Sequence, residues 1–208
     1  MNGDEVLHPG HRSIRLKGRD YSSPGLYFVT ICAHDKQCVF GRIVGGQVQL
    51  SSLGQKAHEC WVGIPLHFAW INLHGFVIMP NHVHGIFEIA SQAGAQHAAP
   101  LQVQVSVERV GPSVKPGSLS AVVRSFKAAV TKRARSELKW AGEIWQRNYF
   151  ERVIRDGQEF SDASRYIAEN PMKWEWDREN LKSKRDPTAE VVGAQHAAPL
   201  QRKTVPWN

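Results

Sequence analysis

The chain has 208 residues and carries 26 lysines and arginines against 19 aspartates and glutamates, which gives a formal net charge of +7. This length allows one domain of good size with tails, and the positive balance suits a polyanionic partner, most simply nucleic acid. No stretch is long and apolar enough to span a bilayer, and the first residues lack a signal-peptide pattern. The cysteines are odd in number and lack the paired spacing of a zinc site, so we expect reduced thiols in or near the core of a cytosolic protein: Cys32, Cys38 and Cys60.

The chain begins with a basic segment, and we predict an N-terminal arm over residues 1–24. The arm ends at a Ser-Ser-Pro sequence, directly before a run of apolar and β-branched residues. Its cationic side chains are candidates for contacts with DNA phosphates, which bind chiefly through charge. These candidates are Arg12, Arg15, Lys17 and Arg19.

The next part of the chain is rich in β-strand patterns. Apolar and β-branched runs predict a buried strand over residues 26–33 and, later in the chain, two further strands that form an antiparallel pair. A helix is expected between the first strand and this pair. A Gly-Gly turn predicts a smaller hairpin before that helix. The smaller hairpin is expected at residues 38–40 and 47–50, the helix at 53–62, and the antiparallel pair at 70–79 and 83–89.

Residues 91–117 differ in composition and are predicted to be a flexible insertion, since they are rich in Gln, Ala, Val, Gly and Pro and lack a hydrophobic period. This insertion contains the sequence GAQHAAPLQ at residues 94–102, which recurs identically at residues 193–201. The second copy lies in a predicted disordered tail over residues 178–208. The main domain is therefore expected over residues 25–177.

A long helix is predicted after the insertion, because Ser118 is a good N-cap and the apolar residues that follow it have a helical period. Its basic side chains fall largely on the opposite side from its apolar residues. They are either a solvated helix face or a second set of phosphate contacts, and the sequence does not decide between the two. These residues are Arg124, Lys127, Lys132 and Arg133.

A last strand is expected over residues 144–154, followed by a helix over residues 158–170 that Pro171 ends. Asp162, Tyr166 and Asn170 are spaced by four and therefore share one helix face. Phe160, Ala163 and Ile167 share another face, which we expect to be buried.

Two histidines on one strand are the strongest chemical signal. His82 and His84 follow the apolar run and turn FVIMPN, and residues two apart on a strand point to the same side of the sheet. Two converging imidazoles make half of a divalent metal site. If the later helix lies across this face, Asn170 offers an amide oxygen as third ligand, and the set suits Mg²⁺ or Mn²⁺ with open positions for water and phosphate.

Tyr166, one turn before Asn170, would then stand beside a bound phosphate. A tyrosine that attacks a phosphodiester forms a phosphotyrosine and releases a 3′-hydroxyl, so the bond energy is kept for a later strand transfer. Tyr149, at the predicted last strand, is a competing nucleophile that spacing alone does not exclude. We favour Tyr166 because a ligand-type residue lies one helical turn away.

The chain resembles the REP-associated tyrosine transposases, a group of the IS200-like single-tyrosine superfamily with a His-hydrophobic-His (HUH) motif. The likeness extends over about residues 8–177, with matching blocks in the family's order. The region after the histidine strand is longer here than is usual in that family, because it contains the repeat. The matching blocks are RSIRLKG at 12–18, YFVTIC at 27–32, FVIMPNHVHG at 76–85, RSFK at 124–127, IWQRNY at 144–149 and RYIAENP at 165–171.

The resemblance implies an α+β fold, a ferredoxin-like (RRM-like) antiparallel sheet with helices on one face. It also implies that His82 and His84 are metal ligands and that Tyr166, with Asn170 one turn later, is the nucleophile. The substrate would be single-stranded DNA containing a small hairpin, as in repetitive extragenic palindromes (REP sequences). Such a protein would be a cytoplasmic, nucleoid-associated monomer or homodimer that does not contact membranes.

Three functions fit these residues. The first is an endonuclease and strand transferase, a transposase, that works through 5′-phosphotyrosine with Mg²⁺ or Mn²⁺. The second is a catalytically inactive, sequence-specific DNA-binding protein of the same fold. The third is a metal-dependent phosphodiesterase in which water is the nucleophile. A covalent adduct between protein and DNA separates the first from the other two.

Overall fold

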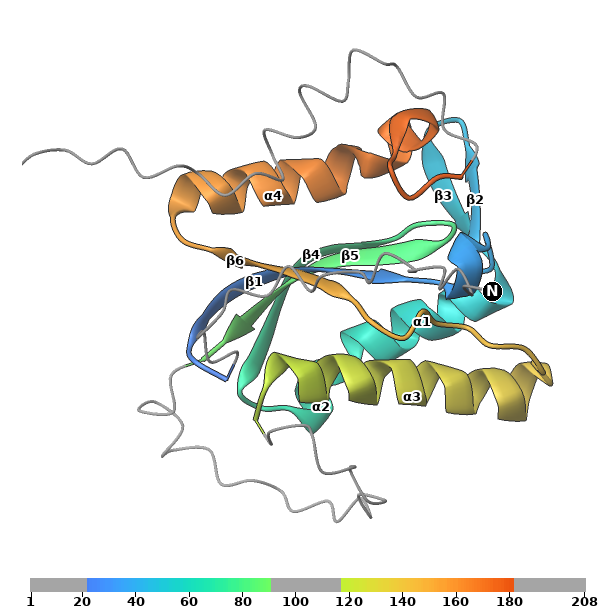
Figure 1. Cartoon of the computed structure of the whole chain (residues 1–208), viewed down its shortest axis with the longest axis horizontal. Coiled ribbons are helices and arrows are strands. Elements are labelled where there is room, and N and C mark those ends of the chain that lie inside the picture. The colour runs from blue at the N-terminus through green and yellow to red at the C-terminus, as the bar shows by residue number, and fades with distance from the viewer. Residues whose placement is uncertain (1–21, 91–116, 182–208) are drawn as a thin grey trace, which may run out of the picture.

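The computed structural model describes residues 22–90 and 117–181, so most of the arm, the insertion and most of the predicted tail lie outside the described residues. The described residues form a sheet with helices above and below it (Figure 1). In chain order the elements are β1 (Gly25–Cys32), η1 (His34–Lys36), β2 (Gly41–Val44), β3 (Gln47–Leu50), α1 (Ser52–Val62), α2 (Ile64–His67), β4 (Ile71–Ile78), β5 (His82–Ile89), α3 (Leu119–Leu138), β6 (Phe150–Ile154), α4 (Gly157–Glu169) and η3 (Asn170–Trp176).

The main sheet has four strands in the order β4-β5-β1-β6, and all neighbouring strands are antiparallel. With α1 between β1 and β4 and α3 between β5 and β6, the connectivity is βαββαβ. This is the ferredoxin-like α+β fold that the resemblance implies. The hairpin of β2 and β3 forms a separate two-stranded sheet.

The two helices of the βαββαβ unit lie on one face of the sheet, and α4 lies on the other (Figure 1). The expectation of helices on one face is therefore correct for α1 and α3 but incomplete, because α4 covers the second face. The amphipathic pattern of α4 explains this placement, since Ala163 and Ile167 pack there against Ile86 and Ile154. The sheet is thus covered on both faces.

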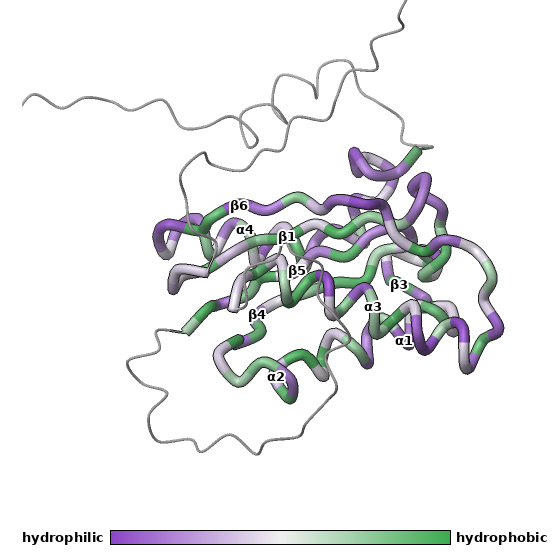
Figure 2. The backbone as a smooth tube through the Cα atoms, turned by 60° about the horizontal axis from the view of Figure 1, so that its bottom comes forward, coloured by the Kyte–Doolittle hydropathy of each residue, from purple (hydrophilic) through white to green (hydrophobic). Residues whose placement is uncertain are grey.

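The larger core lies between the sheet and the pair α1 and α3. It includes Val83 of β5, Trp61 of α1 and Phe126 of α3. Figure 2 shows α3 alternating between hydrophobic and hydrophilic residues along its length, as a helix with one buried face does. The side chain of Ser118 accepts a hydrogen bond from the Ala121 amide and caps this helix, as predicted.

Close packing inside this core requires glycine at position 85 of β5. A Cβ atom added to Gly85 would lie 2.2 Å from a ring carbon of Trp61. Trp61 is fully buried, and its ring centroid lies 4.7 Å from that of Phe87. Only glycine lets the central strand approach the indole this closely.

Two predicted strands differ from the observed ones. The first strand of the hairpin begins at Gly41, after residues 38–40, and β6 begins at Phe150 and not at residue 144. Before β6, Trp145 makes only an isolated bridge to Ala33. This stretch is held instead by Lys127 of α3, whose Nζ donates to the carbonyls of Gln146 and Asn148 at 2.8 and 3.0 Å.

Among the described residues, no helix is long and apolar enough to cross a membrane. None of the three cysteines forms a disulfide within this described part of the chain. Cys32 is buried and Cys60 is half-buried, as expected of core or near-core thiols. Cys38 departs from that expectation because it is exposed in the segment before β2.

Candidate metal centre and nucleophile

Strand β5 directs His82 and His84 toward α4, while Val83 between them points into the larger core. This is the alternation expected of a strand. Both imidazoles are buried, and their ring centroids lie 4.3 Å apart. Because β5 has hydrogen-bonded neighbours on both sides, the backbone fixes the separation of the two rings.

Each imidazole uses its Nδ1 atom for a hydrogen bond within the protein. Nδ1 of His82 lies 2.8 Å from Oδ1 of Asn81, and Nδ1 of His84 lies 2.8 Å from Oγ1 of Thr30. Thr30 is the cross-strand partner of His84 on β1. Both Nε2 atoms are buried and have no hydrogen-bond partner within the described part of the chain.

Burial keeps both histidines neutral at physiological pH. Burial lowers the pKa of His82 to about 3, with a further contribution from the charge of Lys36. For His84, burial and the neighbouring His82 place the pKa well below its usual range, and Asp177 opposes this shift. Neutral imidazole with a free Nε2 lone pair is the form that binds metal ions.

Asn170 lies at the junction of α4 and η3 and is buried beside the histidines. Its Nδ2 donates to Oδ2 of Asp177 at 2.9 Å, and its Oδ1 is buried without a hydrogen-bond partner in the described structure. Oδ2 of Asp177 in turn lies 3.9 Å from Nε2 of His82. The Asn170 amide is therefore oriented with its NH₂ group toward the Asp177 carboxylate, and its oxygen has no hydrogen-bond donor among the described residues.

These groups fit a divalent metal ion. Ligand atoms of His82, His84 and Asp177 all lie within 4.8 Å of one another. Together with Oδ1 of Asn170 they supply two nitrogen and two oxygen donors, and three of these atoms lack a hydrogen-bond partner in the described structure. Buried polar atoms are normally satisfied, so the unsatisfied Nε2 atoms of two neighbouring histidines indicate a missing partner. Two imidazoles and two oxygen atoms form a donor set of the kind that binds divalent metal ions.

Sequence reasoning missed Asp177. It follows η3, at the last residue of the predicted domain, and neither a helical nor a strand period points to it. The segment after it is held in place as well, because Oε2 of Glu179 lies 3.2 Å from both the thiol of Cys32 and Nζ of Lys36. These contacts attach the first residues of the predicted tail to the domain.

The structure brings Tyr166 to the histidines and keeps Tyr149 away from them. The Tyr166 ring lies 5.1 Å from the His84 ring and 6.0 Å from that of Phe28. The residue is 46% exposed, so a substrate can reach it. Tyr149 packs instead against the larger core on the opposite face, and its hydroxyl lies 2.9 Å from Oγ of Ser120 on α3.

Although Tyr166 is partly exposed, its surroundings favour the protonated phenol. Burial raises its pKa above the usual range, and the carboxylates of Asp177 and Glu179 raise it further. Interactions with Asn170 and Arg178 oppose the shift. Positive charge added beside the phenol would counter the two carboxylates and favour phenolate.

The basic residues of α3 do not act as one surface. Lys127 holds the two carbonyls before β6, and burial lowers its pKa to about 8. Arg133 pairs with Glu59 of α1 at 2.6 Å and with Glu137 at 2.9 Å. Arg124 and Lys132 are exposed. The helix itself lies on the face opposite α4 (Figure 1). The arm residues Arg12, Arg15, Lys17 and Arg19 lie outside the described residues.

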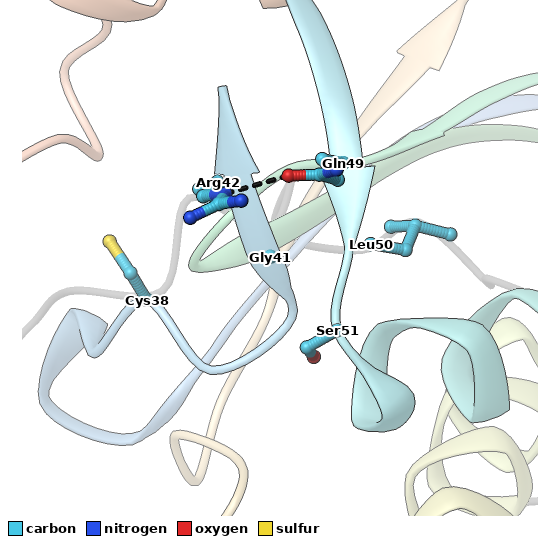
Figure 3. A pocket seen from close by; sticks show the side chains of 6 residues that line it. All are labelled: Cys38, Gly41, Arg42, Gln49, Leu50 and Ser51. Atoms are coloured by element: carbon cyan, nitrogen blue, oxygen red, sulfur yellow. Dashed lines mark hydrogen bonds between the residues drawn. The ribbon is translucent and has the colours of Figure 1, made fainter. Parts of the chain in front are cut away.

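A shallow pocket lies elsewhere, at the hairpin of β2 and β3 (Figure 3). Inside it, Nε of Arg42 donates to Oε1 of Gln49 across the hairpin at 2.7 Å. The pocket contains none of the residues of the histidine site. It is lined by Cys38, Gly41, Arg42, Gln49, Leu50 and Ser51.

Comparison with known proteins relates most of the chain to others. An uncharacterised protein of Haemophilus influenzae is 44% identical over 168 residues, which cover 80% of this chain and 91% of that protein. The two proteins belong to one family. A solved structure, a REP-associated tyrosine transposase bound to a REP hairpin, aligns over 92% of this chain and 93% of its own, with a TM-score of 0.51 and 16% identity. This chain has the fold of that transposase.

A structure from Deinococcus radiodurans R1 covers 74% of this chain and 98% of its own at 15% identity, and its TM-score of 0.39 is too low to establish a common fold. No model of a known protein family matches the sequence. The fold predicted from the resemblance is thus confirmed.

Proposed function

We propose that this protein is a metal-dependent transposase that cuts and rejoins single-stranded DNA through a covalent link to Tyr166. The observation that carries the proposal is the cluster of ligand atoms of His82, His84 and Asp177 within 4.8 Å of one another, with both histidine Nε2 atoms buried and unsatisfied in the described structure, next to a partly exposed tyrosine. A purely structural site would satisfy such atoms within the protein. The likeness of fold to a transposase bound to a REP hairpin supports the same function.

His82, His84 and Asn170 would hold Mg²⁺ or Mn²⁺, and Asp177 would add a carboxylate oxygen. The bound ion would supply Lewis acidity toward a phosphate oxygen and positive charge near the phenol. The side chains around it would exclude water, since both histidines and Asp177 are buried. Exposure of Tyr166 leaves the open side of the site to the DNA strand.

In the proposed reaction, the Tyr166 oxygen forms a bond to phosphorus while the bond from phosphorus to the 3′ oxygen breaks. The phenol proton is lost and the departing 3′ oxygen takes up a proton, so the products are a 5′-phosphotyrosine and a free 3′-hydroxyl. Rejoining reverses these steps with a different 3′-hydroxyl. No bond energy is lost, and the overall exchange needs no nucleotide cofactor.

The proposed substrate is single-stranded DNA with a small hairpin of the REP type, and the arm and exposed basic residues would contact its phosphates. The net charge of +7 supports a polyanionic partner. We further propose that residues 1–24 act as a DNA-binding arm. Residues 25–177 would form the catalytic domain, and residues 178–208 would be a C-terminal tail of which only residues 178–181 are described.

The deciding experiment uses a labelled hairpin oligonucleotide and Mn²⁺. Wild-type protein should give an adduct that survives denaturation, whereas Tyr166→Phe should bind the DNA but give no adduct. Tyr149→Phe is the matched control and should retain the adduct, because Tyr149 lies on the opposite face. An adduct that disappears in Tyr149→Phe and persists in Tyr166→Phe would overturn the assignment. Cleavage without any adduct would favour water as nucleophile, and binding without cleavage would favour the inactive DNA-binding protein.

A second experiment tests the arm. Binding should weaken with salt, and removing one phosphate-binding side chain should reduce the slope of log K against log salt by roughly 0.7 for single strands. A variant with Ala at Arg12, Arg15, Lys17 and Arg19 should therefore show a slope lower by up to about 2.8. An unchanged slope would place the DNA-binding surface elsewhere.

A further inference from the structure

We infer that Asn81 is a positioning residue that sets the ligating nitrogen of His82 and docks the chain segment that carries Asp177. This inference rests on the proposed function and adds to it a residue that touches neither DNA nor metal. Asn81 is 1% exposed and lies in the turn before β5. Its side chain contacts three separate parts of the chain.

The orientation of the Asn81 amide follows from its partners. Nδ2 lies 3.1 Å from the Lys36 carbonyl and 2.6 Å from the Glu179 carbonyl, and carbonyl oxygens only accept. Both amide protons are therefore used, one for each carbonyl. Oδ1 must then face Nδ1 of His82, which lies 2.8 Å away.

An amide oxygen only accepts, so Nδ1 of His82 must carry the proton. A neutral imidazole has one N–H group, and Nε2 is left as a lone pair directed at the ligand cluster. The opposite tautomer would point a proton at the same place and block binding of a cation. Outer hydrogen bonds of this kind fix the tautomer and orientation of metal-binding histidines in other proteins.

The same amide joins the two ends of the domain. Lys36 belongs to η1, directly after β1, and Glu179 lies two residues beyond Asp177. The backbone amide of Glu179 also donates to Oδ1 of Asp177 at 2.6 Å. Fixing the Glu179 carbonyl therefore holds the short turn that presents the Asp177 carboxylate to His82.

Two substitutions separate these roles. Asn81→Asp keeps an acceptor for His82 but cannot donate to the two carbonyls, whereas Asn81→Leu removes both functions at similar volume. The turn has backbone hydrogen bonds that neither change removes, from the amides of Ala33 and Met79 to the Asn81 and His82 carbonyls. Asn72→Leu, at an exposed position of the edge strand β4, is the matched control.

The first readout is ¹⁵N NMR of the His82 ring in chelator-treated protein near pH 7.5. Wild type, Asn81→Asp and Asn72→Leu should all show the Nδ1–H tautomer, and Asn81→Leu should show a mixture. The second readout is hydrogen exchange at the Glu179 amide, which should become faster in both Asn81 variants and stay unchanged in Asn72→Leu. The third is Mn²⁺ affinity, which should fall by about 10- to 100-fold in Asn81→Leu.

The inference would be overturned if His82 of the wild-type protein had the Nε2–H tautomer. It would also be overturned if Asn81→Leu kept both the wild-type His82 tautomer and the wild-type rate of hydrogen exchange at the Glu179 amide. If Asn81→Leu does not fold, faster exchange with an unchanged tautomer in Asn81→Asp still supports it, and unchanged exchange there contradicts it. Wild-type protein that has the expected tautomer but does not bind Mn²⁺ would refute the proposed function and leave the role of Asn81 standing.

Discussion

Removing and restoring the metal should change the thermal stability of this protein by a measurable amount. In the metal-free fold, three buried atoms at the site lack a hydrogen-bond partner among the described residues: Nε2 of His82, Nε2 of His84 and Oδ1 of Asn170. Each such atom costs about 1–3 kcal/mol in lost hydration. The metal-free fold therefore contains an unfavourable contribution of about 3–9 kcal/mol that a bound cation can relieve.

The expected size of the effect follows from linkage. A ligand that binds only the folded state adds about 2.7 kcal/mol when its concentration is 100 times the dissociation constant. For a domain of this size, 1 kcal/mol corresponds to a change in Tm of about 2–4 °C. Saturating Mn²⁺ should thus raise the Tm of chelator-treated protein by about 5–11 °C.

The assay is a thermal melt of chelator-treated protein with and without Mn²⁺. His84→Ala should lose the Mn²⁺-dependent increase, because it removes one of the unsatisfied nitrogen atoms. His74→Ala is the matched control, since His74 lies on neighbouring β4, pairs with Glu88 at 2.9 Å and is outside the ligand cluster. No increase in wild type, or an equal increase in the two variants, would refute the reasoning.

Three further results are expected. Gly85→Ala should lower the free energy of unfolding by about 1–3 kcal/mol in chemical denaturation, since its methyl group would overlap the Trp61 ring; a value within about 0.5 kcal/mol of wild type would contradict this. Iodoacetamide should label exposed Cys38 quickly and buried Cys32 only after denaturation, because burial and Glu179 raise the pKa of the Cys32 thiol. Mass spectrometry of the labelled peptides measures both rates, and equal labelling of the two cysteines in the folded protein would contradict the expectation. Burial lowers the pKa of Lys127 to about 8 from its ordinary 10.5. Between these two pH values the unfolded chain binds more protons than the folded protein. The free energy of unfolding should therefore rise with pH over this range, by up to about 3 kcal/mol. Lys127→Met should flatten that rise in denaturation curves, and an unchanged slope would contradict the cause.

Much of the site could be predicted from local periodicity. A period of two places His82 and His84 on one side of β5, and a spacing of four aligns Tyr166 with Asn170 on α4. Both relations depend only on backbone geometry within one element, and the structure reproduces both. The strand order and the helix pair were expected from the resemblance and not from any single pattern.

The rest depends on contacts between distant segments. Asp177 reaches the histidines only because η3 folds back after Pro171, and nothing in the local sequence distinguishes it from the other acidic residues of the C-terminal region. The partners of Lys127 and Arg133 were likewise hidden, since a basic helix face looks the same in sequence whether it meets phosphates or carbonyls and carboxylates. Spacing alone also does not show that Tyr149 and Tyr166 lie on opposite faces of the sheet.

The hydrophobic core on one face of the sheet is larger than the core on the other. The histidine strand and the Tyr166 helix should therefore differ in how easily they open locally. The histidines belong to a central strand, backed by the large core between the sheet, α1 and α3. The helix of Tyr166 and Asn170 is held by a cluster of four buried residues, Ile86, Ile154, Ala163 and Ile167. Segments with fewer buried apolar contacts open at lower free energy. Mutations that loosen α4 would therefore separate Tyr166 and Asn170 from His82 and His84 long before the domain unfolds. Under the proposed function, such mutations would impair catalysis without any change in global stability.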